Sequence, residues 1–177
     1  MEKTPSFLHQ KTPVVFSVGG PVRTISQREI EFLRRTAKSA SAKSARILLH
    51  GNPKFDLHEM LIVHIAGQYI QPHINDHSAK SFTVIDGEMI IVTYEKDGVI
   101  RDHFQLGDHT TDLPFLLWLQ DPVFHTVLVK SKTVAFIETI RGPHIKTRYA
   151  EFAPSAQETS AVERYMAWLQ AELGITN

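Results

Sequence analysis

A series of short apolar or β-branched runs fills the chain between Arg46 and Ile140, with no helical periodicity between them. Asp86-Gly87 and Lys96-Asp97-Gly98 are typical of tight hairpin turns. Many short strands at this spacing, without intervening helices, indicate an antiparallel sandwich or barrel. We expect strands at residues 46–50, 59–66, 69–73, 81–85, 89–94, 99–106, 113–119, 126–129 and 134–140.

Before this region the sequence predicts one short strand and one helix. Val14–Val18 has strand character, whereas residues 1–12 are polar and expected to be mobile. Ser26 and Glu29 have the spacing of a capping box, and an apolar stripe follows them. We therefore expect a helix at residues 26–38.

After this region the sequence predicts a second helix. Ser155 and Glu158 repeat the capping-box spacing directly after Pro154. One apolar face then follows, formed by Val162, Tyr165, Met166, Leu169 and Leu173. We expect this helix to pack on the barrel or on a neighbouring subunit. The expected organisation is an N-terminal extension with a short strand (1–24), a barrel domain with its N-terminal helix (25–154) and a C-terminal helix (155–177).

Composition limits the partners that a chain of 177 residues can have. Its 19 basic and 19 acidic residues balance, which argues against nonspecific attraction to nucleic acid or membranes. Cysteine is absent, which excludes disulfides and thiolate ligands and fits a reducing compartment. No apolar stretch near Met1 resembles a signal peptide. We expect a cytoplasmic protein that binds a small molecule, with no nucleic-acid or membrane partner.

Two histidines, each at one end of an apolar run, are the candidate centre of a site. His73 follows Pro72, and His125 follows Phe124 some fifty residues later. Along the sequence, Gly67 precedes His73, and Asn75, Lys80 and Gly87 follow it, at the spacing of a metal-binding motif on two neighbouring strands. The interior of a barrel would bring the two imidazoles together.

Strand parity extends the candidate site to other side chains, because alternate residues of a strand share a face. Tyr69 and Gln71 share the face of His73, Phe82 shares that of Lys80, and Val127 shares that of His125. The apolar residues indicate that these faces form the interior. Further polar candidates for the pocket are Arg46, His50 and Glu138. By contrast, His64 in its apolar run has the pattern of a core histidine with satisfied hydrogen bonds.

The residue types allow three outcomes for the metal. In the first outcome a divalent ion is bound by His73, His125 and a substitute ligand such as His77. Alternatively, burial deprotonates Lys80, which then acts as a ligand or base. In the third outcome the ammonium of Lys80 fills the space of the metal, hydrogen-bonded to Asn75 and the imidazoles.

In these residues the sequence resembles the WbuC-type cupin fold metalloproteins from about Ile25 to Glu158. The resemblance includes Ala45–His50, Ala66–Tyr69, Pro72-His73, Lys80–Gly87, Phe124–Val127, Gly142-Pro143 and Glu151–Pro154. It implies a mainly β, double-stranded β-helix (jelly-roll) barrel with an N-terminal and a C-terminal α-helix. It also implies a mononuclear divalent metal (Zn, Fe, Mn or Ni) with His73 and His125 as ligands, while Asn75 and Lys80 stand at the other two ligand positions. Members are often associated with gene clusters for surface polysaccharides.

These observations leave three functions open and do not decide whether the protein is an enzyme. The first is a metal-dependent cupin acting on a small sugar-related or acidic metabolite, with Lys80 or a histidine moving protons. The second is a metal-free protein that binds a small anion or sugar with Lys80, Arg46 and the imidazoles. The third is a metal-free isomerase with a histidine base. Edge strands of such barrels commonly pair, so we also expect a homodimer.

Overall fold

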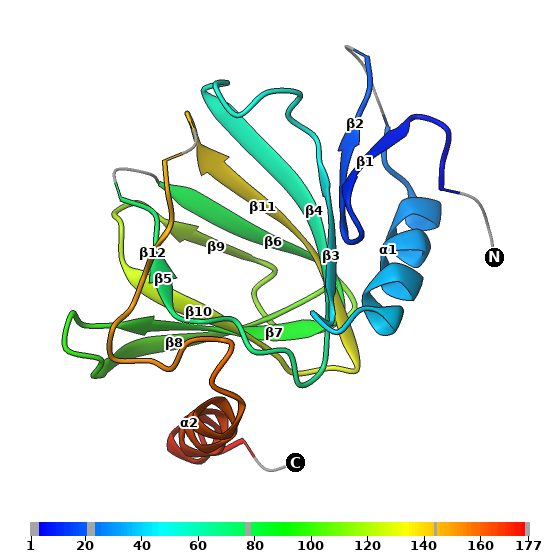
Figure 1. Ribbon diagram of the computed structural model, residues 1–177. Coiled ribbons are helices and arrows are strands. Elements are labelled where there is room, and N and C mark those ends of the chain that lie inside the picture. The colour runs from blue at the N-terminus through cyan, green and yellow to red at the C-terminus, as the bar shows by residue number, and fades with distance from the viewer. Residues whose placement is uncertain (1–3, 21–23, 77–78, 144, 176–177) are drawn as a thin grey trace.

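Two β-sheets face each other in the computed structural model of the protein, which describes residues 4–20, 24–76, 79–143 and 145–175. One sheet has seven strands in the order β1-β2-β3-β4-β11-β6-β9, and the other has five in the order β12-β5-β10-β7-β8 (Figure 1). All strand pairs are antiparallel except β2 and β3. The strands are β1 (Leu8–Thr12), β2 (Val15–Val18), β3 (Ser44–Leu48), β4 (Leu57–Ile65), β5 (His73–Ile74), β6 (Lys80–Asp86), β7 (Glu88–Tyr94), β8 (Ile100–Gly107), β9 (Leu116–Leu119), β10 (Phe124–Val129), β11 (Thr133–Arg141) and β12 (Arg148–Tyr149).

The period of two along each strand sends alternate side chains to separate cores. In β4, Ile62 packs between the two sheets with Phe82 and Phe136. Its neighbours Leu61 and Val63 point to the opposite face of the seven-stranded sheet. The expected inward face of β6 is confirmed, since Lys80, Phe82 and Val84 are all buried.

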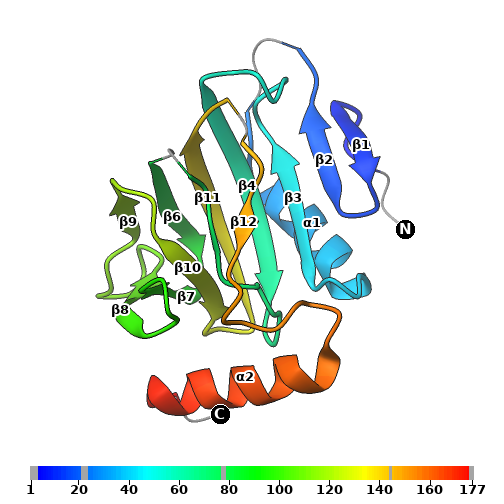
Figure 2. The same ribbon diagram turned by 60° about the vertical axis from the view of Figure 1, so that its left-hand side comes forward.

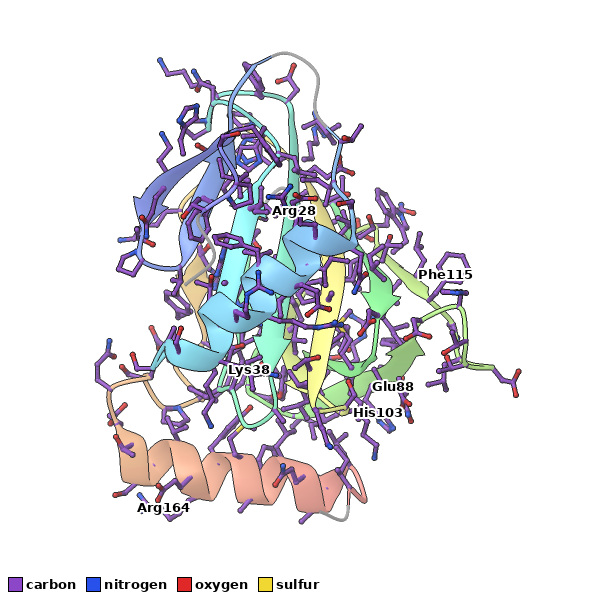
Figure 3. All side chains as sticks on the ribbon, turned by 90° about the vertical axis from the view of Figure 1, so that its right-hand side faces the viewer. Arg28, Lys38, Glu88, His103, Phe115 and Arg164 are labelled. Carbon is purple, nitrogen blue, oxygen red and sulfur yellow. The ribbon has the colours of Figure 1, made fainter. Side chains whose placement is uncertain are left out.

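Helix α1 (Gln27–Ser39) covers the outer face of the seven-stranded sheet. The capping box is present as predicted: the Ser26 amide donates to the Glu29 carboxylate over 2.8 Å, and the Ser26 hydroxyl accepts from the backbone at the start of the helix. Leu33 and Ala37 are completely buried against the sheet. Figure 3 shows this helix across the sheet, with Arg28 and Lys38 at its two ends. The predicted helix is therefore confirmed, within one residue at each end.

Helix α2 (Thr159–Glu172) packs on the outer face of the five-stranded sheet (Figure 1). Leu169 is completely buried there, and the Tyr165 hydroxyl donates to that of Tyr94 over 3.0 Å. Of the two alternatives, the helix packs on this chain's own barrel, whereas the predicted start at Ser155 is wrong. The Glu158 carboxylate does accept from the Ser155 amide, but Glu158 is the N-cap and gives the helix no side-chain cap, so only a turn precedes Thr159.

The short or polar segments differ from the sequence prediction. Residues Leu8–Thr12, expected to be mobile, form β1, which pairs with β2 and extends this chain's own sheet. Most of its side chains are exposed, so it carries no apolar alternation. Of the expected strand 69–73 only His73 is in a strand, β5, and β12, which passes in front of the large sheet in Figure 2, was not predicted. No helix in the described ranges is long and apolar enough to cross a membrane.

Candidate functional site

The two candidate histidines meet across one strand pair. His73 in β5 is the register partner of His125 in β10, and their ring centroids lie 4.6 Å apart. Each ring is oriented by a backbone carbonyl: His73 Nδ1 lies 3.0 Å from the Gln71 oxygen and His125 Nδ1 lies 2.9 Å from the Val123 oxygen. Since a carbonyl only accepts, both Nδ1 atoms donate, and each neutral ring keeps its lone pair at Nε2.

The environment keeps both imidazoles neutral. Burial lowers the pKa of His73, and the nearby positive charge of Lys80 lowers it further. The same two causes, in the same order, hold the pKa of His125 well below its usual range. Neutral rings with a bare Nε2 can accept a hydrogen bond or a proton, or bind a metal.

Lys80 reaches this pair from the neighbouring sheet. Its Nζ lies 3.1 Å from His125 Nε2 and 2.8 Å from Glu138 Oε1. The Lys80 side chain is 3% exposed and that of Glu138 is 15% exposed, so the ion pair is largely shielded from water. Burial alone would raise the pKa of Glu138, but the charge and hydrogen bond of Lys80 outweigh it and hold that pKa below its usual range.

The register of β6 and β11 explains this ion pair. Phe82 in β6 is the register partner of Glu138 in β11, and Lys80 lies on the same face as Phe82. The ammonium also lies 5.5 Å from the centre of the Phe82 ring, within range of a cation–π interaction. One of the three outcomes for the metal included a hydrogen bond between Lys80 and Asn75, which the described residues do not form. The Lys80 amine bonds to His125 and Glu138, and Asn75 Nδ2 donates to the Thr147 hydroxyl over 3.1 Å.

A cavity of about 500 Å³ lies between the two sheets beside these groups. It is lined by His73, His125 and Glu138 and by four further predicted pocket residues, namely Arg46, Tyr69, Gln71 and Phe82. Lys80 is not among the residues that line it, and lines a separate, much smaller void together with His125 and Asn75. The structure thus brings all the predicted pocket residues except His50 to one cavity, without Lys80 in its lining.

A second cavity of about 360 Å³ adjoins the first. Arg46, His73, Glu138 and Thr147 line both cavities and so form the junction between them. The predicted pocket residue His50 lines only the second cavity. There it stacks on His58 with ring centroids 4.1 Å apart, and its Nδ1 lies 3.2 Å from a backbone carbonyl.

The sequence interpretation of His64 is right about its burial and wrong about its hydrogen bonds. It is buried beside Phe136 and lines the first cavity, and its Nδ1 has no hydrogen-bond partner among the described residues. Burial, aided by the charge of Arg46, lowers the pKa of His64 to about 3. The parity of β4, which places His64 on the face of Ile62, was the signal that could have assigned it to the cavity.

The described residues do not fit a divalent metal. His73 and His125 provide two imidazole donors, but the Lys80 amine bonds to the Nε2 atom that would ligate the ion, and its charge repels a cation. No group of three or more His, Cys, Asp or Glu side chains placed to hold a metal occurs within the described parts of the chain. His77, the expected substitute ligand, lies outside the described residues.

Comparison with known proteins identifies the fold but no activity. Residues 25–106 match the family model of a domain of unknown function, DUF6016. No curated protein sequence matches significantly. Among solved structures, an uncharacterized conserved protein with a double-stranded β-helix domain from Klebsiella pneumoniae is similar at 17% identity and a TM-score of 0.53, covering 74% of this chain and 99% of that one.

Two oxalate oxidase structures are also similar. The one in complex with the substrate analogue glycolate has 10% identity and a TM-score of 0.52, with 73% of this chain and 68% of that chain covered. The recombinant one, also with glycolate, has 12% identity and a TM-score of 0.50, with 63% of this chain covered. The alignment covers only 57% of the length of that recombinant chain. At these identities the likeness concerns the fold alone.

The chain therefore has the cupin fold, a mainly β double-stranded β-helix with two helices, as predicted. The matching family model is DUF6016 and not that of the WbuC-type cupins, so the finer resemblance stays a prediction.

Proposed function

We propose that the protein binds a small hydroxylated organic anion, such as a sugar acid, in the cavity between its sheets without a metal. The observation that carries this proposal is the use of Lys80 and Glu138 to neutralise each other beside His125. Because Lys80 and Glu138 neutralise each other, the remaining charge among the described residues that line the cavity is the guanidinium of Arg46.

Electrostatics favours an anion at Arg46. Its charge is felt by His64, His73 and Glu138, which places the guanidinium close to the centre of the site. Arg46 forms no ion pair with another residue of the described chain. A guanidinium fork matches a carboxylate in a bidentate geometry, and in a partly buried cavity such a pair is stronger than in water.

The other polar side chains of the cavity suit hydroxyl groups. Gln68, Gln71, Thr147 and Gln157 line it, and His73 offers a bare Nε2 as an acceptor. Such groups donate and accept, as the recognition of a polyol requires. A sugar acid also agrees with the resemblance to WbuC-type cupins, which would place the protein in surface-polysaccharide metabolism.

A divalent metal at His73 and His125 is the competing function. Its support is the pair of Nε2 lone pairs on rings whose centroids lie 4.6 Å apart. It requires Lys80 Nζ to leave His125. Metal analysis of purified protein separates the two proposals: about one equivalent of tightly held Zn, Fe, Mn or Ni would favour this alternative.

Titration calorimetry with glucuronate in the presence of EDTA tests the anion-binding proposal. We expect binding that chelator does not abolish, and a loss of about ten- to a hundredfold in affinity for Arg46→Gln, since a charged hydrogen-bonding partner contributes about 1.5–3 kcal/mol. Arg101→Gln, which changes an arginine with a 59% exposed side chain on β8, is the matched control and should bind as the wild type does. Equal affinities of Arg46→Gln and Arg101→Gln would refute the role of Arg46.

A further inference from the structure

The first cavity, of about 500 Å³, is named the inner cavity below, and the second, of about 360 Å³, the outer cavity. The outer cavity, which joins the inner one at Arg46, is not required for a free sugar acid. Apart from the junction residues and Asn75, its lining consists of the stacked rings of His50 and His58 and of apolar side chains, namely Val15, Leu48, Pro53, Met60 and Ile140. We infer that this outer cavity binds an apolar substituent of the same ligand, so that the ligand is a glycoside of a uronic acid with an apolar aglycone. This inference rests on the proposed function.

The position of Arg46 at the junction determines which part of such a ligand lies in which cavity. Arg46 belongs to both linings, so a carboxylate bound there has one cavity on each side. In a uronic-acid glycoside the carboxylate and the aglycone stand on the two carbons that flank the ring oxygen, and the hydroxyls lie along the opposite edge. With the carboxylate at Arg46, the hydroxyls face the polar inner cavity and the aglycone enters the outer one.

The chemistry of the two linings supports this division. Polar side chains that recognise hydroxyls lie in the inner cavity, whereas the outer cavity offers aliphatic side chains and a stacked imidazole pair. Removing apolar surface from water contributes about 25 cal/mol for each Å² buried, so a bound aromatic aglycone should raise affinity clearly. A free sugar acid leaves that contribution unused.

The test compares glucuronate with 4-nitrophenyl glucuronide, in both anomers, by titration calorimetry. Both probes carry the same carboxylate and the same hydroxyls at the sugar ring edge. We expect at least one anomer of the glycoside to bind about tenfold or more tightly than glucuronate. If glucuronate binds and neither glycoside binds more tightly, the inference on the outer cavity is wrong while the proposed function stands. If no probe binds, both are wrong.

Variants that fill the outer cavity test whether the additional affinity of the glycoside arises there. Leu48 lines it and belongs to none of the hydrophobic core clusters, so Leu48→Trp fills space without removing a core side chain. Val15→Trp is a second variant chosen on the same grounds. Ile85→Trp is the matched control, because Ile85 is 40% exposed on β6.

In variants that keep the wild-type circular dichroism spectrum, Leu48→Trp and Val15→Trp should reduce glycoside affinity to that of glucuronate. They should change glucuronate affinity by less than about threefold, since the carboxylate and hydroxyl contacts lie elsewhere. Ile85→Trp should bind both probes as the wild type does. An unchanged preference for the glycoside in both blocking variants would overturn the inference, as would loss of glucuronate binding.

Discussion

Replacing each partner of the ion pair between Lys80 and Glu138, singly and together, tests the feature on which the site depends. The two side chains are 3% and 15% exposed, and 2.8 Å separates their charged atoms. Removing one partner of a buried ion pair leaves an uncompensated charge, which costs about 3–5 kcal/mol. We therefore expect Lys80→Met to lose about that much stability at pH 7. Glu138→Gln should lose somewhat less, because His125 and the new amide oxygen still accept from the ammonium.

The double variant separates pairing from packing. Without either charge nothing is left uncompensated, so its loss should be smaller than the sum of the single losses by about 2–3 kcal/mol. Urea unfolding followed by circular dichroism at pH 7 measures all four proteins. The same cycle at Arg101 and Glu95, which lie 3.8 Å apart with both side chains more than half exposed, serves as the control and should be additive within error. Additive losses at Lys80 and Glu138 would show that the amine is not charged in the folded protein and would refute the reasoning.

Three further predictions concern metal, pH and packing. Lys80→Glu places a carboxylate beside two imidazoles and a second carboxylate, which together suit Zn²⁺. After dialysis this variant should retain about one equivalent of Zn²⁺, whereas the wild type should retain none. Equal zinc contents would contradict the placement of Lys80 at the metal position. Burial lowers the pKa of His64, His73 and His125 below the usual 6.5, so the unfolded chain takes up more protons as the pH falls below that value. Stability should be full above about pH 6.5 and fall below it by up to about 1.4 kcal/mol per pH unit for each histidine, and a flat profile of urea unfolding between pH 7.5 and 5.5 would argue against neutral, buried rings. Leu169→Ala removes a completely buried contact of α2 with the barrel and should cost about 2–5 kcal/mol in the same assay; a loss below about 1 kcal/mol would mean that α2 is not held at this residue.

The elements that could be predicted are those indicated by patterns among residues close together in the sequence. The capping box of Ser26 and Glu29 marks the start of α1, because both its hydrogen bonds join residues of one turn. Gly87, with a φ of 86°, joins β6 to β7 in a conformation that glycine adopts without steric cost. Such signals are local. Strand β1 lacks them, since its pairing with β2 depends on backbone hydrogen bonds and its side chains are mostly exposed.

The site was predictable only in part, for the same reason. Strand parity placed His73, Lys80 and His125 in the interior, because parity is a property of each strand alone. The partner of Lys80 was not predictable, since it depends on the register of β6 against β11, strands far apart in the sequence. Glu138 was recognised as a pocket candidate, but no local pattern indicates that its carboxylate faces the amine.

The WbuC-type pattern has a carboxylate at the position of Lys80, and a lysine there does not by itself mean that the site lacks a function. A divalent metal would concentrate positive charge at His73 and His125, whereas the ion pair of Lys80 with Glu138 contributes none in total. The positive charge that is not neutralised by a described lining residue is therefore that of Arg46, at the junction of the two cavities. A metal polarises the atom that it binds, but a guanidinium fork orients a planar anion and leaves its bonds intact. Under the proposed function the cavity recognises an anion without Lewis-acid chemistry. Backbone carbonyls orient both imidazoles, and the Lys80 amine additionally binds His125 Nε2.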